Sequence, residues 1–138
     1  MRLLAAIALA AATGAAAQVA PLSFDAGKSL PLAAGQWIYL QGVAGSEARF
    51  GGLLSLRCDR TDRVVVVQRI GAAPSALTIA TSSVTRSIPI GGRIIANDLL
   101  LDAIAFSRGR FLVAGGAGPV LAVPSWPEAA RSIEDCRN

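Results

Sequence analysis

The chain contains only two cysteines, Cys58 near its middle and Cys136 close to its end. If they are bonded to each other, the last residues are fixed to the middle of the chain, and no other intrachain pairing exists. In a chain-entropy treatment, closing a loop of roughly 79 residues stabilises the folded state by about 4 to 4.5 kcal/mol, less any native strain. No other sequence feature restricts the fold so strongly, and the redox compartment decides whether the bond forms.

The first 17 residues indicate export to an oxidising compartment. They carry a positive charge at Arg2, an apolar run over residues 3–12 and a small-residue triplet over 15–17, which is the layout of a secretory signal peptide. The apolar run is shorter than the roughly 20 residues that a membrane span needs. We therefore predict cleavage after Ala17, rather than an uncleaved anchor or a buried helix, and a periplasmic or secreted protein without a transmembrane segment.

Export favours a disulfide between Cys58 and Cys136, because the periplasm and the extracellular space are oxidising. The alternative is a pair of free thiols with a redox or metal-binding role. A zinc site needs more ligands than two thiolates, and the chain has no histidine. We predict the disulfide, no metal and no cofactor.

Cleavage after residue 17 leaves 121 residues, which is the size of one domain. We expect a signal peptide over 1–17 and a single β-rich domain over 18–138. Its first part, 18–35, is expected to be an extended lead-in with one short edge strand near residues 22–24. The expected mature part has 12 basic and 9 acidic residues, and its arginines are dispersed. This distribution is typical of a solvated surface, so we expect no nucleic-acid partner.

The middle of the chain has the pattern of an antiparallel meander, in which β-branched and apolar segments alternate with turn residues. Four valines follow the turn DRTD, and their stiff side chains suit a pleated sheet better than a helix. Trp37 and Tyr39 share one face of the first segment. We favour core packing for this pair over a stacking platform for a sugar or peptide. We expect strands over residues 36–41, 46–50, 53–58, 63–70, 76–81 and 84–90.

The last third of the chain predicts a helix, a hairpin and a second helix. Asp98 or the residue before it can cap a helix that begins at Leu99 and ends near Gly109. Apolar runs over 110–114 and 119–123, joined by GGAG, predict a buried hairpin.

Ser125 and Glu128 have the spacing of a capping box, which predicts the start of the last helix. The expected buried face includes Trp126, Ala130, Ile133 and Cys136, and Arg131 is expected to pair with Asp135 at the surface. These elements predict an α+β fold that is mainly β. We expect an antiparallel β-sandwich or flattened barrel of about seven to nine strands with one inserted helix and a C-terminal helix.

The residue inventory argues against several catalytic classes. Without histidine, no Ser-His pair can activate the serines and threonines over 81–87. No phosphate-binding loop, dinucleotide fingerprint or nucleophile elbow is present. Carboxylate pairs of the glycosidase type depend on spatial separation, which sequence does not give. We predict no catalytic residue and keep a small carboxylate-dependent hydrolase as an alternative.

The segment SRGRF over 107–111 carries the candidate binding residues. Arg108 and Arg110 flank a glycine at the junction of two expected elements, and together they could bind a carboxylate or phosphate. The alternative is a helix end followed by an edge strand, without a ligand.

The chain has, in order, QWIYL over 36–40, a β meander, LDAIAFSRGRF over 101–111, a hairpin and an end at IEDC. This order of elements resembles that of small exported β-rich proteins of the invasion-associated locus B type. The resemblance implies a compact β-sandwich in the bacterial envelope with no catalytic centre. This chain has only one cysteine pair, and no binding residue is implied.

We therefore expect a non-catalytic binding, inhibitory or accessory module of the envelope, either a monomer or a weak oligomer. Its expected partner is an envelope protein or an anionic envelope component. A further alternative is an envelope assembly factor that acts through an exposed strand edge.

Overall fold

The computed structural model describes Gly14 and the ranges 21–116 and 118–138. The predicted signal peptide lies outside the described residues apart from Gly14, as does the start of the lead-in. Among the described residues, no helix is long and apolar enough to span a membrane.

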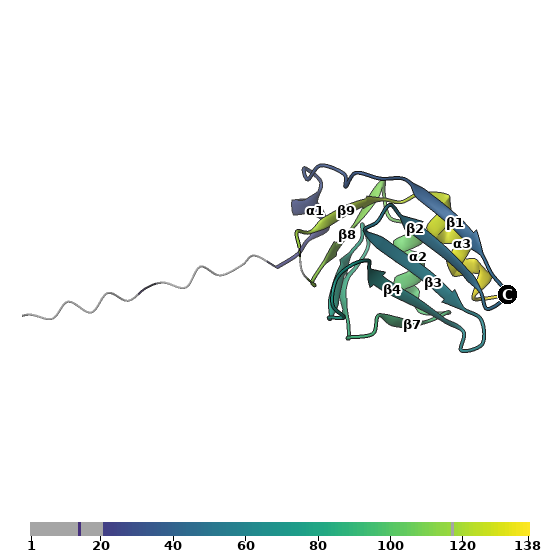
Figure 1. The fold of residues 1–138 in the computed structure, drawn as a ribbon. Coiled ribbons are helices and arrows are strands. Elements are labelled where there is room, and N and C mark those ends of the chain that lie inside the picture. Colours follow the sequence, from purple (N-terminus) through teal and green to yellow (C-terminus); the bar gives the residue numbers. More distant parts are fainter. Residues whose placement is uncertain (1–13, 15–20, 117) are drawn as a thin grey trace, which may run out of the picture.

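The described part of the chain folds into two antiparallel sheets with three helices (Figure 1). One sheet has the order β1-β2-β3-β4-β7, and the other has the order β6-β5-β8-β9. The prediction of a mainly β, α+β fold is confirmed, and β7 is a strand that we did not expect. The elements are α1 (Phe24–Gly27), β1 (Trp37–Gln41), β2 (Ser46–Phe50), β3 (Leu54–Asp59), β4 (Val64–Arg69), β5 (Leu77–Ala80), β6 (Thr85–Ile88), β7 (Arg93–Ile95), α2 (Leu99–Ala105), β8 (Arg110–Ala114), β9 (Leu121–Pro124) and α3 (Pro127–Asp135).

The five-stranded sheet has a buried inner face and a mixed outer face. Trp37 pairs with Phe50 across β1 and β2, and their rings meet edge to face with centroids 5.4 Å apart. The indole N–H of Trp37 donates to the carbonyl of Pro124 in β9 at 2.7 Å, which joins the two sheets. Trp37 is therefore a core residue, as predicted, while Ile38 on the other face is 49% exposed.

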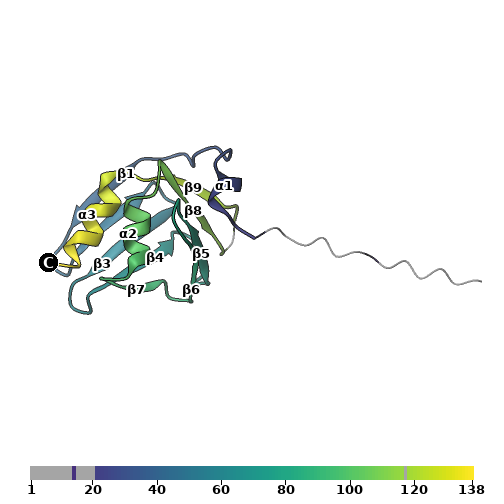
Figure 2. The same cartoon turned by 180° about the vertical axis from the view of Figure 1, so that it is seen from behind.

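Helices α2 and α3 lie over the inner face of the five-stranded sheet, beside the four-stranded sheet (Figure 2). α3 contacts β1, β2, β3 and α2. Its Ser132 is fully buried and lies 3.2 and 3.1 Å from the carbonyl oxygens of Ser46 and Leu56. Both sheets and both helices contribute to one apolar cluster.

The lead-in contains the short helix α1 where we expected an edge strand near residues 22–24, so that prediction is wrong. The Ser23 hydroxyl accepts from the amide of Ala26 at 3.1 Å and favours a helical turn over extended backbone. Gly27 packs so closely on Leu112 of β8 that a Cβ atom would lie 2.0 Å from it. α1 therefore covers the outer face of the four-stranded sheet.

α2 begins where the sequence predicts and ends earlier. The Asp98 carboxylate accepts from the amide of Leu100 at 2.8 Å and caps the helix. The helix ends at Ala105, before the expected stop at Gly109, because the next residues turn toward β8. The Ser107 hydroxyl donates to the carbonyl of Arg110, and Gly109 takes a φ of +76° in this turn.

The predicted capping box at the start of α3 does not form. The helix begins at Pro127, and the hydroxyl of Ser125 and one carboxylate oxygen of Glu128 have no hydrogen-bond partner among the described residues. The amide of Ser125 donates to the carbonyl of Gly109, which holds this residue in the preceding turn. Trp126 occupies the cap position and is 47% exposed, so its expected burial is wrong.

The predicted ion pair between Arg131 and Asp135 is also absent from the described contacts. Both side chains turn to Tyr39 of β1. Asp135 accepts from the Tyr39 hydroxyl, and the Arg131 guanidinium lies 4.1 Å from the centre of the Tyr39 ring. A neighbouring strand has therefore replaced the local partner.

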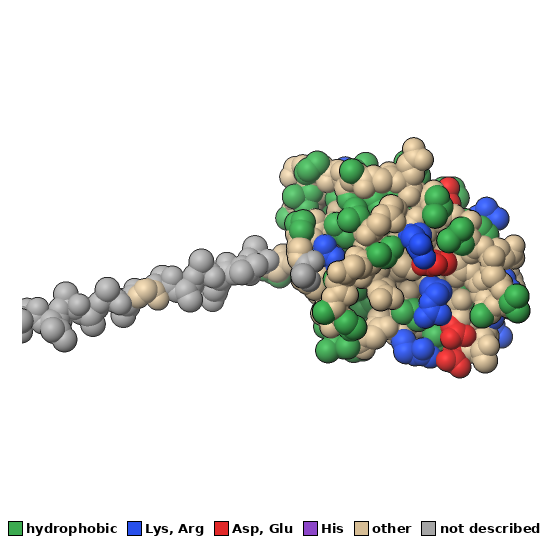
Figure 3. Space-filling model, in the orientation of Figure 1, with side chains coloured by type: hydrophobic (Ala, Val, Ile, Leu, Met, Phe, Trp, Pro, Cys, Tyr) green, Lys and Arg blue, Asp and Glu red, His purple; other side chains and the backbone are tan. Residues whose placement is uncertain are grey.

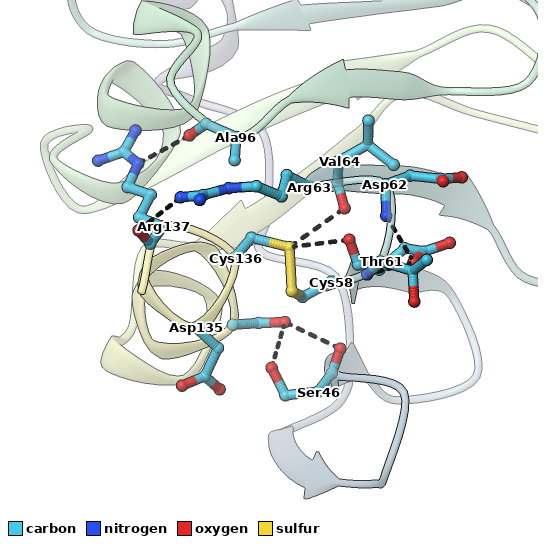
Figure 4. Close-up of a disulfide and its surroundings, with 12 residues drawn as sticks. Ser46, Cys58, Thr61, Asp62, Arg63, Val64, Ala96, Asp135, Cys136 and Arg137 are labelled. Carbon is cyan, nitrogen blue, oxygen red and sulfur yellow. Dashed lines mark hydrogen bonds between the residues drawn. A yellow bond between two sulfur atoms is a disulfide. The ribbon is translucent and has the colours of Figure 1, made fainter.

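Cys58 and Cys136 form the predicted disulfide, which joins β3 to the end of α3 (Figure 4). Both residues are almost completely buried. Next to the bond, Arg137 donates to the carbonyl of Ala96 at 2.7 Å, and Arg63 donates to the carbonyl of Arg137 at 2.8 Å.

We predict that the double variant Cys58→Ala, Cys136→Ala has a free energy of unfolding about 2 to 4 kcal/mol lower than the parent, because the unfolded chain regains loop entropy. Urea unfolding with and without reductant measures the effect. Reductant should destabilise the parent and leave the variant unchanged. Alkylation of two thiols in the unreduced parent, detected by intact mass, would contradict the disulfide.

Candidate functional site

An open cavity of about 650 Å³ lies between the edge strand β6 and the exposed side of α2. We call it the α2–β6 groove. β6 is at the end of its sheet, and α2 follows β7 in the chain, so residues from separate parts of the sequence meet here. The groove is lined by Ser82, Ser83, Val84, Arg86, Leu99, Leu100, Asp102, Ala103, Phe106 and Arg108.

Three exposed apolar side chains gather around this groove. Leu99 is 78% exposed and Phe106 is 80% exposed, at the two ends of α2, and Val84 is 40% exposed in the turn before β6. Single exposed apolar residues are common on soluble proteins, but several around one hollow indicate an interaction surface.

One charge in the groove is already neutralised. Arg86 donates two hydrogen bonds to the carboxylate of Asp98, at 2.8 and 2.7 Å. The Arg86 guanidinium, together with the amide of Leu100 and against the effect of burial, holds the pKa of Asp98 below its ordinary value. This ion pair fastens the beginning of α2 to β6.

Arg108 is positioned at the groove by its backbone. Its amide donates to the Ser82 hydroxyl at 3.0 Å, and the amide of Ser82 donates to the Ser107 hydroxyl at 3.0 Å. The Arg108 side chain is exposed and forms no ion pair with the described residues. Asp102, the carboxylate that lines the groove, pairs with Arg137 at 2.8 Å. Arg108 is therefore the positive charge that a ligand in the groove can reach.

The structure does not bring Arg110 to the same place. Its guanidinium donates to the carbonyl of Leu30 in the lead-in at 2.5 Å, and it does not line the groove. The two arginines of the segment SRGRF therefore have different surroundings. Ligand binding by Arg108 remains a prediction, whereas Arg110 has a structural contact.

Sequence reasoning missed the apolar part of the groove, although a signal was present. Leu99 and Phe106 are seven residues apart and lie on the same side of a helix. They are opposite the buried stripe of Leu100, Leu101 and Ile104. An apolar pair outside the core stripe could have marked this side as a contact surface. Arg86 had no comparable signal, because its position depends on the pairing of β5 with β6.

The outer face of the five-stranded sheet offers a second charged surface (Figure 3). Two of its charges are paired with each other: Arg49 donates to both carboxylate oxygens of Glu47, and Ser55 donates to the same carboxylate at 2.6 Å. Exposed Arg57 of β3 forms no ion pair with the described residues. Partial burial raises the pKa of Glu47, but these bonds outweigh it and lower the pKa overall. Because the Glu47 carboxylate on this surface is already occupied, and the exposed apolar side chains Leu99 and Phe106 lie at the groove, this surface is a weaker candidate than the groove.

The described residues include no group of three histidine, cysteine, aspartate or glutamate side chains that could hold a metal ion. Four carboxylates have a shifted pKa, and in each case the pKa is lowered: Asp25, Glu47, Asp98 and Asp135.

We predict that Asp98→Ala lowers the free energy of unfolding by about 1 to 2 kcal/mol, because it removes both the helix cap and the partner of Arg86. Asp98→Asn keeps the capping oxygen and should lose less than half of that. Because the folded-state pKa is depressed, the stabilisation is present above the ordinary pKa and is lost as pH falls toward the folded-state value. Urea unfolding at about pH 7 and about pH 3 measures this dependence.

The exposed Asp25→Asn variant is the control and should change stability little. If Asp98→Ala lowers the free energy of unfolding equally at both pH values, the ionised carboxylate makes no contribution and the prediction is contradicted.

No protein-family model, no curated protein sequence and no solved structure matches this chain. The likeness to exported proteins of the invasion-associated locus B type therefore stays a resemblance of layout, and no residue role is transferred from it. The function has to be argued from the groove itself.

Proposed function

We propose that this protein is a non-catalytic binding module of the bacterial envelope, periplasmic or secreted. Its α2–β6 groove receives a segment of a partner protein that carries both an apolar side chain and a carboxylate. The observation that carries the proposal is the meeting of exposed Leu99 and Phe106 with the unpaired Arg108 around one cavity.

The apolar rim supplies the driving force for binding. Fully burying one leucine or phenylalanine side chain contributes about 1.5 to 3 kcal/mol. Leu99 and Phe106 lie at opposite ends of the seven-residue helix α2, so an occupant that covers both must extend along the helix. This geometry favours a peptide segment over a compact small molecule.

Charge complementarity selects an acidic segment. Arg86 and Asp102 are neutralised within the protein, which leaves the positive charge of Arg108 uncompensated. A guanidinium binds a carboxylate through two parallel hydrogen bonds, and such charge-assisted bonds are stronger than neutral ones. An acidic residue beside an apolar anchor therefore matches the groove.

A second candidate function uses the strand edge at the groove. β6 pairs with β5 on one side and has no strand on its other side among the described residues. Its residues Thr85, Arg86 and Ser87 are exposed. An extended segment could add to this edge by backbone hydrogen bonds, which is the action of an assembly factor. The same partner segment could use the edge and the groove.

A carboxylate-dependent hydrolase receives less support. A general acid needs a raised pKa so that it keeps its proton near neutral pH. In this protein the carboxylates with a shifted pKa all have it lowered, and Asp102 at the groove is paired with Arg137.

NMR titration of the isotope-labelled protein with short peptides tests the proposal. The probes pair phenylalanine or leucine with glutamate, and matched peptides carry glutamine instead. We expect the glutamate peptides to shift amide signals over 82–86 and 99–108 and to bind at least fivefold more tightly than the glutamine peptides.

Two variants and one control locate the interaction. Arg108→Gln should remove the preference for glutamate, and Phe106→Ser should weaken both peptide series. Arg57→Gln changes an exposed arginine on the outer face of the five-stranded sheet and should have no effect. Equal binding of glutamate and glutamine peptides, or signals that shift only away from the groove, would refute the proposal.

A further inference from the structure

Arg69, at the end of β4, is a buried arginine without a carboxylate partner. It is 8% exposed, and its described hydrogen bond is a donation to the carbonyl of Gly115 at 2.8 Å. All nine aspartate and glutamate side chains of the chain lie within the described residues, and none of them forms an ion pair with Arg69. The positive charge is therefore uncompensated by any acidic side chain of its own chain.

A buried charge of this kind normally has a counter-ion. Arginine is almost never fully buried unless it is paired, because removal of the guanidinium from water is unfavourable. One backbone carbonyl satisfies only one of its five N–H donors. Half-buried Arg137, by comparison, pairs with Asp102 and Glu134.

Arg69 also lines a small cavity of about 180 Å³, which we call the Arg69 pocket. Val67 of β4 and Leu77 of β5, both nearly completely buried, supply apolar surface. The loop between these strands closes the side with Ala73, Pro74 and Ser75. The pocket thus combines one positive group and the polar residues Gln68 and Ser75 with apolar surface, and a few polar groups among apolar ones are the usual composition of a small-molecule site.

Gly92, which also lines the pocket, is held by a close backbone contact. Gly92 accepts through its carbonyl from the amide of Val67 at 2.9 Å, and its φ is +65°. A Cβ atom at this position would lie 1.9 Å from the carbonyl oxygen of Val67, so only glycine fits. The cavity is therefore bounded by backbone that has little room to collapse.

We propose that the Arg69 pocket binds a small monocarboxylate with a short apolar body. The carboxylate pairs with the Arg69 guanidinium, and the apolar body packs on Val67 and Leu77. A single guanidinium matches a single negative charge, which favours a monoanion over a phosphate dianion. The volume accommodates about six water-sized groups, so the body is limited to a short branched chain. This site is separate from the α2–β6 groove and does not depend on its function.

Two sources share this chemistry: a free short-chain acid, and the terminal carboxylate of a peptide that ends in an apolar residue. Calorimetric titration of the protein with isovalerate and with the tripeptide Gly-Gly-Leu distinguishes them. The neutral controls are isovaleramide and the tripeptide amide. We expect at least one carboxylate to bind with a Kd between about 0.1 and 5 mM, and its amide at least tenfold more weakly.

Arg69→Met removes the charge and keeps much of the side-chain volume. Because the ligand-free parent buries an unpaired charge, this variant should be at least as stable as the parent in the absence of ligand. The carboxylate should raise the Tm of the parent and leave that of Arg69→Met unchanged. Arg57→Met, at an exposed position, should respond like the parent.

If Arg69→Met does not fold, the variant Ala73→Trp tests the proposal instead. Ala73 is an exposed loop residue that lines the pocket, so a tryptophan side chain there should fill the pocket while Arg69 is kept. Binding of the carboxylate should then weaken at least tenfold. Equal affinity for acid and amide, full affinity in a folded Arg69→Met or Ala73→Trp variant, or no binding of either carboxylate would overturn the proposal.

Discussion

The covalent bond between Cys58 and Cys136 is the constraint on which the arrangement of the helices depends. α3 has nine residues, too few to be a stable helix in isolation, and its position comes from the sheet beneath it and the bond at its end. Arg137, next to that bond, then holds Asp102 of α2. The disulfide therefore helps to position α2, and with it one wall of the α2–β6 groove, through the ion pair between Arg137 and Asp102. Neither cysteine lines the groove itself.

The elements that could be predicted are those whose signals are local. The hairpin across DRTD, the β8–β9 hairpin and the Asp98 cap depend on residues within a few positions of each other. The failures have long-range causes. Ser125 is held by Gly109, and Asp135 is held by Tyr39, so tertiary partners replaced the local ones that spacing suggested. The strand β7 lacked a signal of its own because its three residues are stabilised by pairing with β4.

In the candidate sites, too, features with local sequence signals could be predicted and features that depend on distant segments could not. Arg108 was accessible to sequence reasoning because it flanks a glycine at an element boundary, but the separation of Arg108 from Arg110 follows from the lead-in packing on β8. Arg69 follows four valines and a glutamine and has the appearance of an ordinary strand end. Its importance depends on which carboxylates lie nearby, and ion pairing between distant segments cannot be obtained from a single sequence.

The attachment of α2 at two points, its N-cap and its middle, has a consequence for recognition. Asp98 ties its beginning to Arg86 on the four-stranded sheet, and Asp102, one turn later, ties it to Arg137 after α3. A short helix fixed in this way gives the groove a preformed wall. The loss of conformational entropy on association then falls mainly on the incoming segment. Among occupants of equal composition, a cyclised or otherwise rigid segment should therefore be held more tightly than a flexible one.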